Sequence, residues 1–259
     1  METVLVEKIG QVMHITMNRP EKRNAFSNLL WKEFSDALVQ FDEDDSMRVA
    51  IITANGPCFC AGSDIKELAL GTQKAPEGRE DWGFAGLTRH TYKKPIIACV
   101  HGAVYGGGLE LMMACDLVVA VRSAKFALPE PTIGAMAENG FVNLINQIPF
   151  RIALELLFTG EPIDSERAWN IGLINRIVES EEELLPEALK IAEKICQMAP
   201  LPIEFSKEIA TRCKGLPSRA PSAAWDVVDE VAVKLYASHD FAEGTNAFRE
   251  KRKPVWTGK

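Results

Sequence analysis

The pattern of apolar and polar positions predicts strands alternating with helices along the first part of the chain. Two strand-like runs open it, Val4–Ile9 and Val12–Met17, and the second alternates in polarity as a half-buried strand does. Ser27 is a suitable N-cap for a helix from about Leu29 to Phe41. The short apolar run Val49–Thr53 then predicts a buried strand.

A second cycle of the same kind follows. Pro95–Val100 and Leu117–Val121 are typical of strands. Between them, a glycine-rich turn at Gly102–Gly108 leads into a helix from Leu109 to about Cys115. Residues 71–81 are polar and mixed, which predicts a mobile loop.

The chain becomes mostly helical after Leu144, with one further strand at Ile174–Val178. The predicted helices in this part are Arg151–Phe158, Ser165–Ile171, Glu182–Met198, Pro202–Lys214 and Ala223–Ser238. Pro200 and Pro202 form a natural boundary between two regions. We therefore expect a β-rich α/β core at 1–199, which holds the active site, and a helical region at 200–259.

The composition is that of an ordinary globular protein. Apolar residues make up 47% and charged residues 25% of the 259 positions, and a chain of this length can bury a sizeable core. The formal net charge of −7 disfavours nonspecific binding to nucleic acid. No apolar run reaches the roughly 18 to 20 residues that a membrane span needs. The acidic start of the chain resembles neither a signal peptide nor a transit peptide.

The cysteines and histidines predict neither a disulfide framework nor a metal site. The six cysteines show no Cys-x-x-Cys spacing, and five of them lie among apolar or small neighbours. Reduced thiols in a cytoplasmic protein are therefore the preferred interpretation. The four histidines show no ligand spacing, so we predict no metal.

Two segments combine small residues with a predicted helix start. They are Phe59-Cys60-Ala61-Gly62-Ser63-Asp64-Ile65 and His101-Gly102-Ala103-Val104-Tyr105-Gly106-Gly107-Gly108-Leu109-Glu110. Small residues let the backbone approach a ligand closely, and the free N–H groups at a helix start favour negative charge. One N–H group from each segment could therefore bind a single oxyanion. The alternative is that the glycines only make tight turns.

These two segments resemble the oxyanion-hole motifs of the enoyl-CoA hydratase/isomerase (crotonase) family. The resemblance continues in the expected order through Asn18-Arg19-Pro20, Asn24-Ala25, Lys94–Ala98, Phe126–Glu130, Phe158-Thr159-Gly160 and Phe248–Arg252. It implies a spiral of repeated β-β-α turns with a helical C-terminal trimerisation region, assembled as a trimer or a dimer of trimers. It also implies a thioester oxyanion held by the backbone N–H groups of Ala61 and Gly107. No cofactor is expected beyond the coenzyme A of the substrate.

Glu110 and Glu130 match the paired glutamates of the hydratases in this family. The resemblance gives one carboxylate the task of activating water for attack at the β-carbon, and gives the other proton exchange as acid or base. A thioester carbonyl acidifies its α-carbon because the enolate places charge on the oxygen. Donors aimed at that oxygen stabilise the enolate.

Glu138 departs from the hydratase pattern, in which a small residue is usual at this position. Dienoyl-CoA isomerases and carnitinyl-CoA dehydratases carry an aspartate there, so we expect a third catalytic carboxylate facing the acyl chain. Trp82–Thr88 also resembles the carnitinyl-CoA dehydratases, whose acyl chain carries a trimethylammonium group, and Trp82 with Glu138 could bind such a cation. The alternatives are a glutamate that points to water and a tryptophan that only anchors a loop.

The resemblance also indicates residues that bind coenzyme A. The tail at 241–259 has five basic and two acidic residues, a net charge of +3. Phe248 and Lys251 match residues that contact coenzyme A bound to a neighbouring subunit, and Lys22 and Arg23 resemble another stretch that contacts its phosphates. A solvated basic terminus is the alternative for the tail. The other expected substrate contacts are Ala25, Ser63, Asp64, Ile65 and Trp82.

The predicted function is that of an acyl-CoA lyase, which adds water to a 2-enoyl-CoA thioester or removes it through an enolate. Isomerisation of an enoyl- or dienoyl-CoA is the alternative, because three acids suit stepwise proton transfer. A β-dicarbonyl acyl hydrolase is disfavoured. A non-catalytic paralogue that binds coenzyme A or RNA is also disfavoured, because both glutamates and both oxyanion motifs are present and the chain is acidic.

The expected partners are the acyl-CoA and further copies of the chain, with no nucleic acid and no membrane. The helical segment after Pro202 is amphipathic, and a monomer would expose its apolar face, so we expect neighbouring chains of a trimer or hexamer to bury it. The residues expected on that face include Val227, Val228, Val231 and Leu235.

Overall fold

Three strongly apolar strands form the centre of the main sheet. β3 (Val49–Ala54), β4 (Ile96–Val100) and β6 (Leu117–Val121) pair in parallel and are almost entirely buried. Burial on both faces explains why these segments are apolar throughout rather than alternating. The computed structural model describes residues 2–217, 219 and 222–259. Within them the sheet order is β1-β2-β3-β4-β6-β9, and the outer strands are β1 (Val4–Ile9), β2 (Val12–Met17) and β9 (Arg176–Val178).

The chain enters a second, smaller sheet after it leaves strands of the main sheet. It consists of β5 (Ala103–Tyr105), β7 (Lys125–Ala127) and β8 (Ile163–Asp164), and Cys60 adds a parallel bridge to Val104. Each turn of the chain thus passes through both sheets before it reaches a helix. β3 is followed by α2 (Ile65–Ala69), and β4 with β5 is followed by α3 (Gly107–Ala114). The result is a spiral of β-β-α turns.

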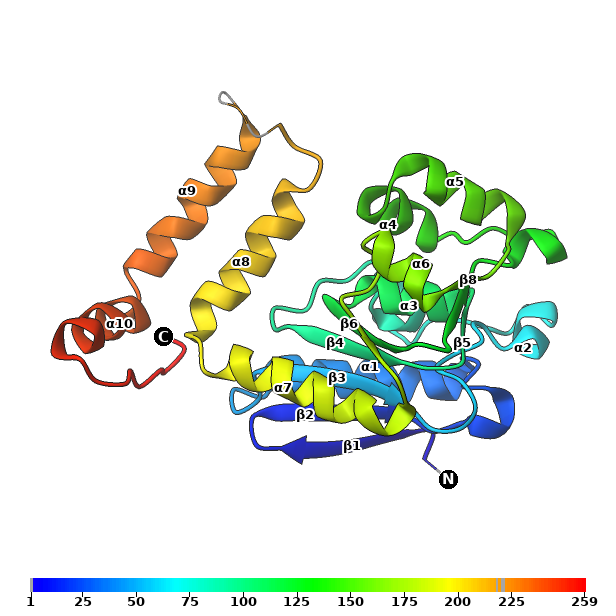
Figure 1. Cartoon of the computed structure of the whole chain (residues 1–259), viewed down its shortest axis with the longest axis horizontal. Coiled ribbons are helices and arrows are strands. Elements are labelled where there is room, and N and C mark those ends of the chain that lie inside the picture. The colour runs from blue at the N-terminus through cyan, green and yellow to red at the C-terminus, as the bar shows by residue number, and fades with distance from the viewer. Residues whose placement is uncertain (1, 218, 220–221) are drawn as a thin grey trace.

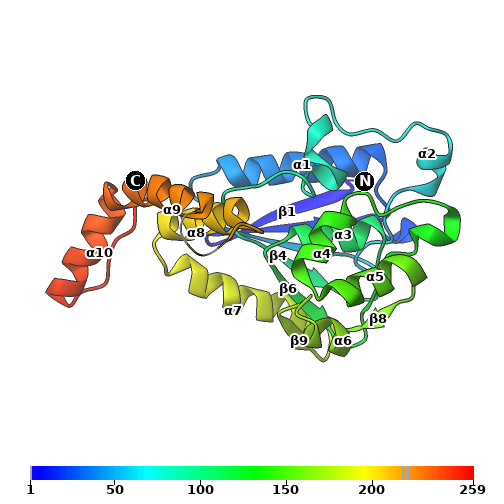
Figure 2. The same cartoon turned by 90° about the horizontal axis from the view of Figure 1, so that it is seen from above.

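Helices cover both faces of the main sheet. Figure 2 shows α1 (Asn28–Glu43) on one side and α7 (Leu184–Cys196) on the other. Ser27 caps α1 by accepting a hydrogen bond from the Leu30 N–H group at 3.3 Å. The buried side chains of α7 recur at helical spacing and pack on alternate residues of the strands. Three further helices, α4 (Gly140–Gln147), α5 (Phe150–Thr159) and α6 (Ser165–Asn170), surround α3 and the second sheet.

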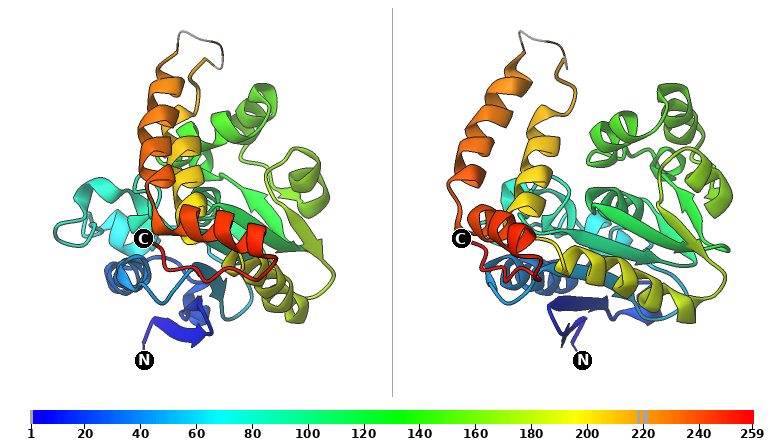
Figure 3. Two further views of the ribbon diagram at one scale, coloured as in Figure 1. Left: turned by 90° about the vertical axis from the view of Figure 1, so that its left-hand side faces the viewer. Right: turned by 60° about the vertical axis from the view of Figure 1, so that its left-hand side comes forward.

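The C-terminal helices form an arm that extends from the core (Figure 1). It consists of α8 (Pro200–Cys213), α9 (Ala223–Tyr236) and α10 (His239–Glu250). Both views in Figure 3 show α8 and α9 side by side. An ion pair of 2.6 Å between Lys207 and Asp116 joins α8 to the end of α3, and the buried carboxylate of Asp240 accepts hydrogen bonds from the N–H groups of Thr257 and Gly258. The arm and the tail are therefore held by specific contacts. None of the helices in the described residues is long and apolar enough to cross a bilayer.

The prediction that a single chain exposes the apolar face of the arm around Val231 is wrong. Val231 is only 1% exposed, and Val227, Val228 and Leu235 are half-buried, because α9 pairs with α8 within one chain. The apolar side chains that do remain exposed on α9 and α10 include Val233 at 71%, Tyr236 at 63% and Phe248 at 88%.

One buried side chain holds the turn between β2 and α1. The Asn24 side-chain amide donates to the carbonyl groups of Asn55 and Cys58, each at 2.9 Å, and its oxygen accepts from the Arg19 N–H group at 2.9 Å. Asn24 is also in the left-handed region, with φ of 54°, which asparagine tolerates better than most residues. The side chain therefore connects this turn to the segment that follows β3.

Replacing Asn24 by alanine should lower the free energy of unfolding by about 1–3 kcal/mol, because buried backbone groups lose their partners. Urea titration of the variant and wild type gives this difference. Asn146→Ala is the control, because its exposed side chain bonds within the described residues only to the Val142 carbonyl one turn earlier. That change should stay within about 0.5 kcal/mol, and equal losses in both variants would contradict the role of Asn24.

Candidate active site

The two predicted oxyanion segments touch each other through their backbones. A Cβ atom on Gly62 would lie 3.1 Å from the Gly107 nitrogen and 3.3 Å from the Tyr105 oxygen. A Cβ atom on Gly108 would collide with the Cys60 carbonyl. Gly62 also has φ of 100°, a conformation that residues with side chains rarely adopt. Glycine is thus required on both sides of this contact.

Only one of the two predicted oxyanion donors is free. The Ala61 N–H group donates to the Arg23 carbonyl at 3.0 Å, so its assignment to the oxyanion is wrong. The N–H groups of Ser63 and Gly107 donate to no acceptor within the described ranges of the chain. Gly107 is the first residue of α3, where a helix leaves its N–H groups without internal partners. Ser63 forms a short parallel bridge with Phe26, in which the hydrogen bonds come from the Gly62 carbonyl and the Asp64 N–H group on either side of it. The N–H group of Ser63 itself therefore points away from Phe26.

Glu110 lies in the first turn of α3 and is only 4% exposed. Its Oε1 accepts hydrogen bonds from the N–H groups of Gly140 at 2.6 Å and Asn139 at 3.0 Å. Burial raises the pKa of this carboxyl to about 7, the Gly140 donation opposes that change, and the charge of Glu130 adds to it. Glu110 can therefore gain or lose a proton near neutral pH.

Glu130 also reaches the glycine turn. It opens the short helix η4 (Glu130–Ile133), and its Oε1 would lie 3.0 Å from a Cβ atom on Gly106. Its Oε2 is buried and has no hydrogen-bond partner among the described residues. Burial raises the pKa of Glu130 as well. The structure therefore brings Glu110 and Glu130 together around the glycine turn, as the sequence predicts.

Glu138 does not join this pair. It lies in the segment between η4 and α4, and its side chain is exposed. The charged group that perturbs Glu110 is Glu130. The exposure of Glu138 favours the alternative of a glutamate that points to water, and its expected place beside the acyl chain stays a prediction.

Trp82 is packed as a loop anchor. Its ring stacks on His90, with centroids 3.9 Å apart and planes 13° from parallel, and it meets Tyr92 edge-on. The Arg79 guanidinium also lies 5.4 Å from the Trp82 centroid. The Trp82 ring thus already contacts one cation and one stacked ring, which fits the alternative of a tryptophan that anchors a loop.

The structure gathers most of the predicted substrate contacts near the oxyanion turn. Ala25 and the exposed Lys22 and Arg23 lie in the turn that leads to Phe26 and its bridge with Ser63. Next to Ser63, Asp64 caps α2 and forms an ion pair of 2.7 Å with Arg19, which holds the Asp64 pKa low. Ile65 follows at 59% exposure.

Phe248 and Lys251 are not brought to the site of their own chain. They lie at the end of α10, at the opposite side of the molecule from α2 (Figure 1). Lys251 is exposed and caps α10 in a left-handed conformation with φ of 56°.

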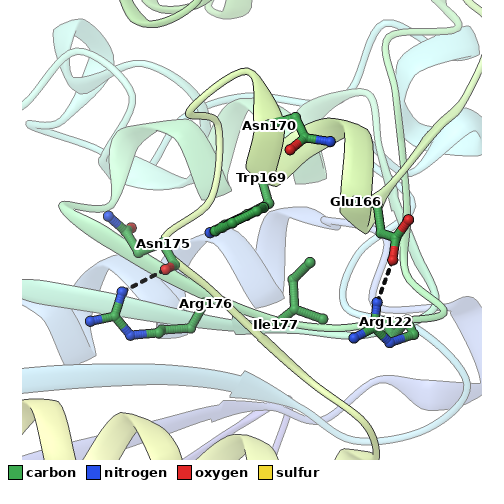
Figure 4. Close-up of a pocket in the computed structure, with 7 residues that line it drawn as sticks. All are labelled: Arg122, Glu166, Trp169, Asn170, Asn175, Arg176 and Ile177. Atoms are coloured by element: carbon green, nitrogen blue, oxygen red, sulfur yellow. Dashed lines mark hydrogen bonds and ion pairs between the residues drawn. The ribbon is translucent and has the colours of Figure 1, made fainter.

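A separate hollow of about 540 Å³ lies between α6 and β9 (Figure 4). Its lining residues are Arg122, Glu166, Trp169, Asn170, Asn175, Arg176 and Ile177. Arg122 is already neutralised there by Glu166 at 2.6 Å and by Glu179 at 2.7 Å. Neither Glu110 nor Glu130 lines this hollow, so it is not part of the candidate active site.

Comparison with known proteins gives consistent results. A family model described as enoyl-CoA hydratase/isomerase matches residues 7–259. The chain is 37% identical to a carnitinyl-CoA dehydratase of Citrobacter koseri, over 100% of this chain and 99% of that protein. Its structure is similar to that of an enoyl-CoA hydratase from Mycobacterium tuberculosis H37Rv, with a TM-score of 0.92, 38% identity and 100% of both chains covered. It is also similar to a carnitinyl-CoA hydratase from Mycobacterium avium, with a TM-score of 0.79, 37% identity and 100% of both chains covered.

Proposed function

The chain belongs to the enoyl-CoA hydratase/isomerase family, and we propose that Glu110 and Glu130 are the acid–base pair of its active site. It is an acyl-CoA lyase, which adds water to the double bond of a 2-enoyl-CoA thioester or removes water in the reverse direction. The predicted fold and reaction class are confirmed, and the isomerase alternative is not favoured. The observation that supports the pair most directly is that the buried carboxyl of Glu110 and the half-buried carboxyl of Glu130 both lie at one glycine turn.

The surroundings of the two carboxyls suggest different roles. Two backbone N–H groups hold Oε1 of Glu110, and such donors stabilise the ionised form. This leaves Oε2 of Glu110 to take a proton from water as the water attacks the β-carbon. Glu130 has a buried oxygen with no partner among the described residues, which favours a carboxyl that carries a proton. In the hydration direction Glu130 would deliver that proton to the α-carbon.

The thioester oxygen is expected to bind the N–H groups of Ser63 and Gly107. Both groups are free, and the two turns that carry them are in contact. Charge develops on that oxygen when the α-carbon becomes an enolate, so preorganised donors lower the barrier. No cofactor other than the substrate's coenzyme A enters this scheme.

Association of several chains would complete the coenzyme A site. Phe248 and Lys251 lie far from the glycine turn of their own chain, and Phe248 is 88% exposed. The arm also exposes Val233 and Tyr236, which a trimer or a dimer of trimers would cover. A cytoplasmic location is supported by the six cysteines, all of which are free thiols in the described residues.

Glu110→Gln and Glu130→Gln should each lower kcat for hydration of crotonyl-CoA by at least about 10²-fold, because each removes a proton carrier. Glu138→Gln is the matched control, since its side chain is exposed, and its kcat should stay within about twofold of wild type. A comparable loss in Glu138→Gln would show that the pair is incomplete. Full activity in either of the first two variants would refute the assignment.

A crystal structure with an unreactive acyl-CoA should place the thioester oxygen at about 2.7–3.1 Å from the nitrogens of both Ser63 and Gly107. The Ala61 N–H should keep its bond to the Arg23 carbonyl. A thioester oxygen bound by Ala61 instead of Ser63 would overturn the choice of donor.

Val233→Glu should weaken association, because it places a charge on an apolar surface that is 71% exposed in a single chain. Light scattering at micromolar concentration should give a trimer or hexamer for wild type and a smaller mass for the variant. Leu70→Glu, at a position 76% exposed but outside the arm, is the control and should leave the mass unchanged. A monomeric wild-type protein would contradict the proposal.

A further inference from the structure

Asn139 connects the buried Glu110 to the surface of the protein. Its N–H group donates to Glu110 Oε1 at 3.0 Å, and its side-chain oxygen accepts a hydrogen bond from Arg89 Nε at 2.9 Å. The next residue, Gly140, provides the shorter of the two donations to Glu110, at 2.6 Å. The conformation of Asn139 therefore controls the direction of both N–H groups that hold the carboxylate.

The side chain of Arg89 is exposed, and its backbone is anchored in its loop. Its N–H group donates to the Trp82 carbonyl at 3.0 Å, and Trp82 is stacked on His90. A Cβ atom on Gly83 would lie 2.7 Å from the Arg89 Cγ, so the glycine leaves room for the arginine stem. No carboxylate in the described residues forms an ion pair with Arg89, and its hydrogen-bond partner is Asn139.

We propose that Arg89 is a positioning residue for Glu110 and acts through the side chain of Asn139. Arg89 holds the side-chain oxygen of Asn139 and so keeps the backbone N–H groups of Asn139 and Gly140 aimed at Oε1 of Glu110. Oε2 of Glu110 then faces the water to be activated. Arg89 does not touch the reacting atoms in this scheme. The proposal rests on the proposed function, in which Glu110 is the base.

The surroundings of Glu110 give this contact a measurable consequence. The charged group that faces Glu110 is Glu130, on η4, and α4 contributes only the uncharged donors of Asn139 and Gly140. Glu130 favours the protonated form of Glu110, and the donors favour the ionised form. Loosening Asn139 therefore shifts the balance towards protonation, and the pKa of Glu110 should rise from its value of about 7.

The test is the pH dependence of kcat/KM for hydration of crotonyl-CoA in Asn139→Ala, Arg89→Ala and Arg89→Lys. A base must be ionised to act, so activity falls below its pKa. The acidic limb should move up by about 0.5–1 pH unit in the two alanine variants, which is about a 3- to 10-fold loss below the limb. At pH values above the acidic limb, kcat/KM of these variants should nearly equal that of wild type, and KM should change by less than about twofold. Arg89→Lys should return the limb part of the way to its wild-type position, because the ammonium group can still donate to the side-chain oxygen of Asn139.

Two controls separate this proposal from a general effect of removing an arginine. Arg176→Ala removes an exposed arginine whose hydrogen bond is to the adjacent Asn175 carbonyl, and its pH profile should match wild type. In the double variant Arg89→Ala/Asn139→Ala, the limb should lie where it lies in Asn139→Ala alone, since Arg89 acts only through that side chain.

The outcomes distinguish failure of this inference from failure of the proposed function. An unchanged limb in Asn139→Ala and Arg89→Ala would overturn the inference, as would a raised KM with an unchanged limb, because Arg89 would then bind substrate. Additive shifts in the double variant would overturn the route through Asn139. These results would leave the acid–base pair intact, whereas an active Glu110→Gln enzyme would remove the basis of both proposals.

Discussion

The contact between two glycine turns is the constraint on which the rest of the site depends. The backbone around Gly62 lies against the start of α3, and Gly108 packs on the Cys60 carbonyl. A side chain at either position would separate the two turns, and the N–H groups of Ser63 and Gly107 would no longer share one space. Because Glu110 follows in the first turn of α3, the same contact also fixes the position of the proposed base.

The second feature of the site is that its two carboxyls, one buried and one half-buried, have no cation beside them among the described residues. Desolvation raises the pKa of both Glu110 and Glu130, and backbone N–H groups only partly offset it at Glu110. Asp64, which follows Ser63 in the chain, has a lowered pKa instead, because it forms a hydrogen-bonded ion pair with Arg19. The protein thus separates the two carboxyls that we propose exchange protons from a carboxylate that is held in an ion pair.

The arm separates two tasks in space. Its attachment through Lys207 and Asp116 leaves α10 on the side of the molecule opposite α2. If Phe248 and Lys251 contact coenzyme A, as we propose, they would contact a molecule bound to another copy of the chain, which would couple the proposed assembly to substrate binding. The intrachain pairing of α8 with α9 covers the apolar face that a simple amphipathic pattern would assign to the oligomer interface.

The sequence by itself determined the central strands of the main sheet, because burial on both faces leaves a continuous apolar run that can be recognised without its partner strands. It predicted β1, β2 and β6 with their observed bounds, and the motifs identified Glu110 and Glu130 as a pair. It missed β5, β7 and β8, which are too short to show a period, and it missed α4 and α10. Only the tertiary structure decided that Ala61 is engaged and Ser63 is free, because the acceptor on Arg23 comes from a distant segment. It also decided that Glu138 is exposed and that Arg89 reaches Asn139, since both depend on how separate loops pack.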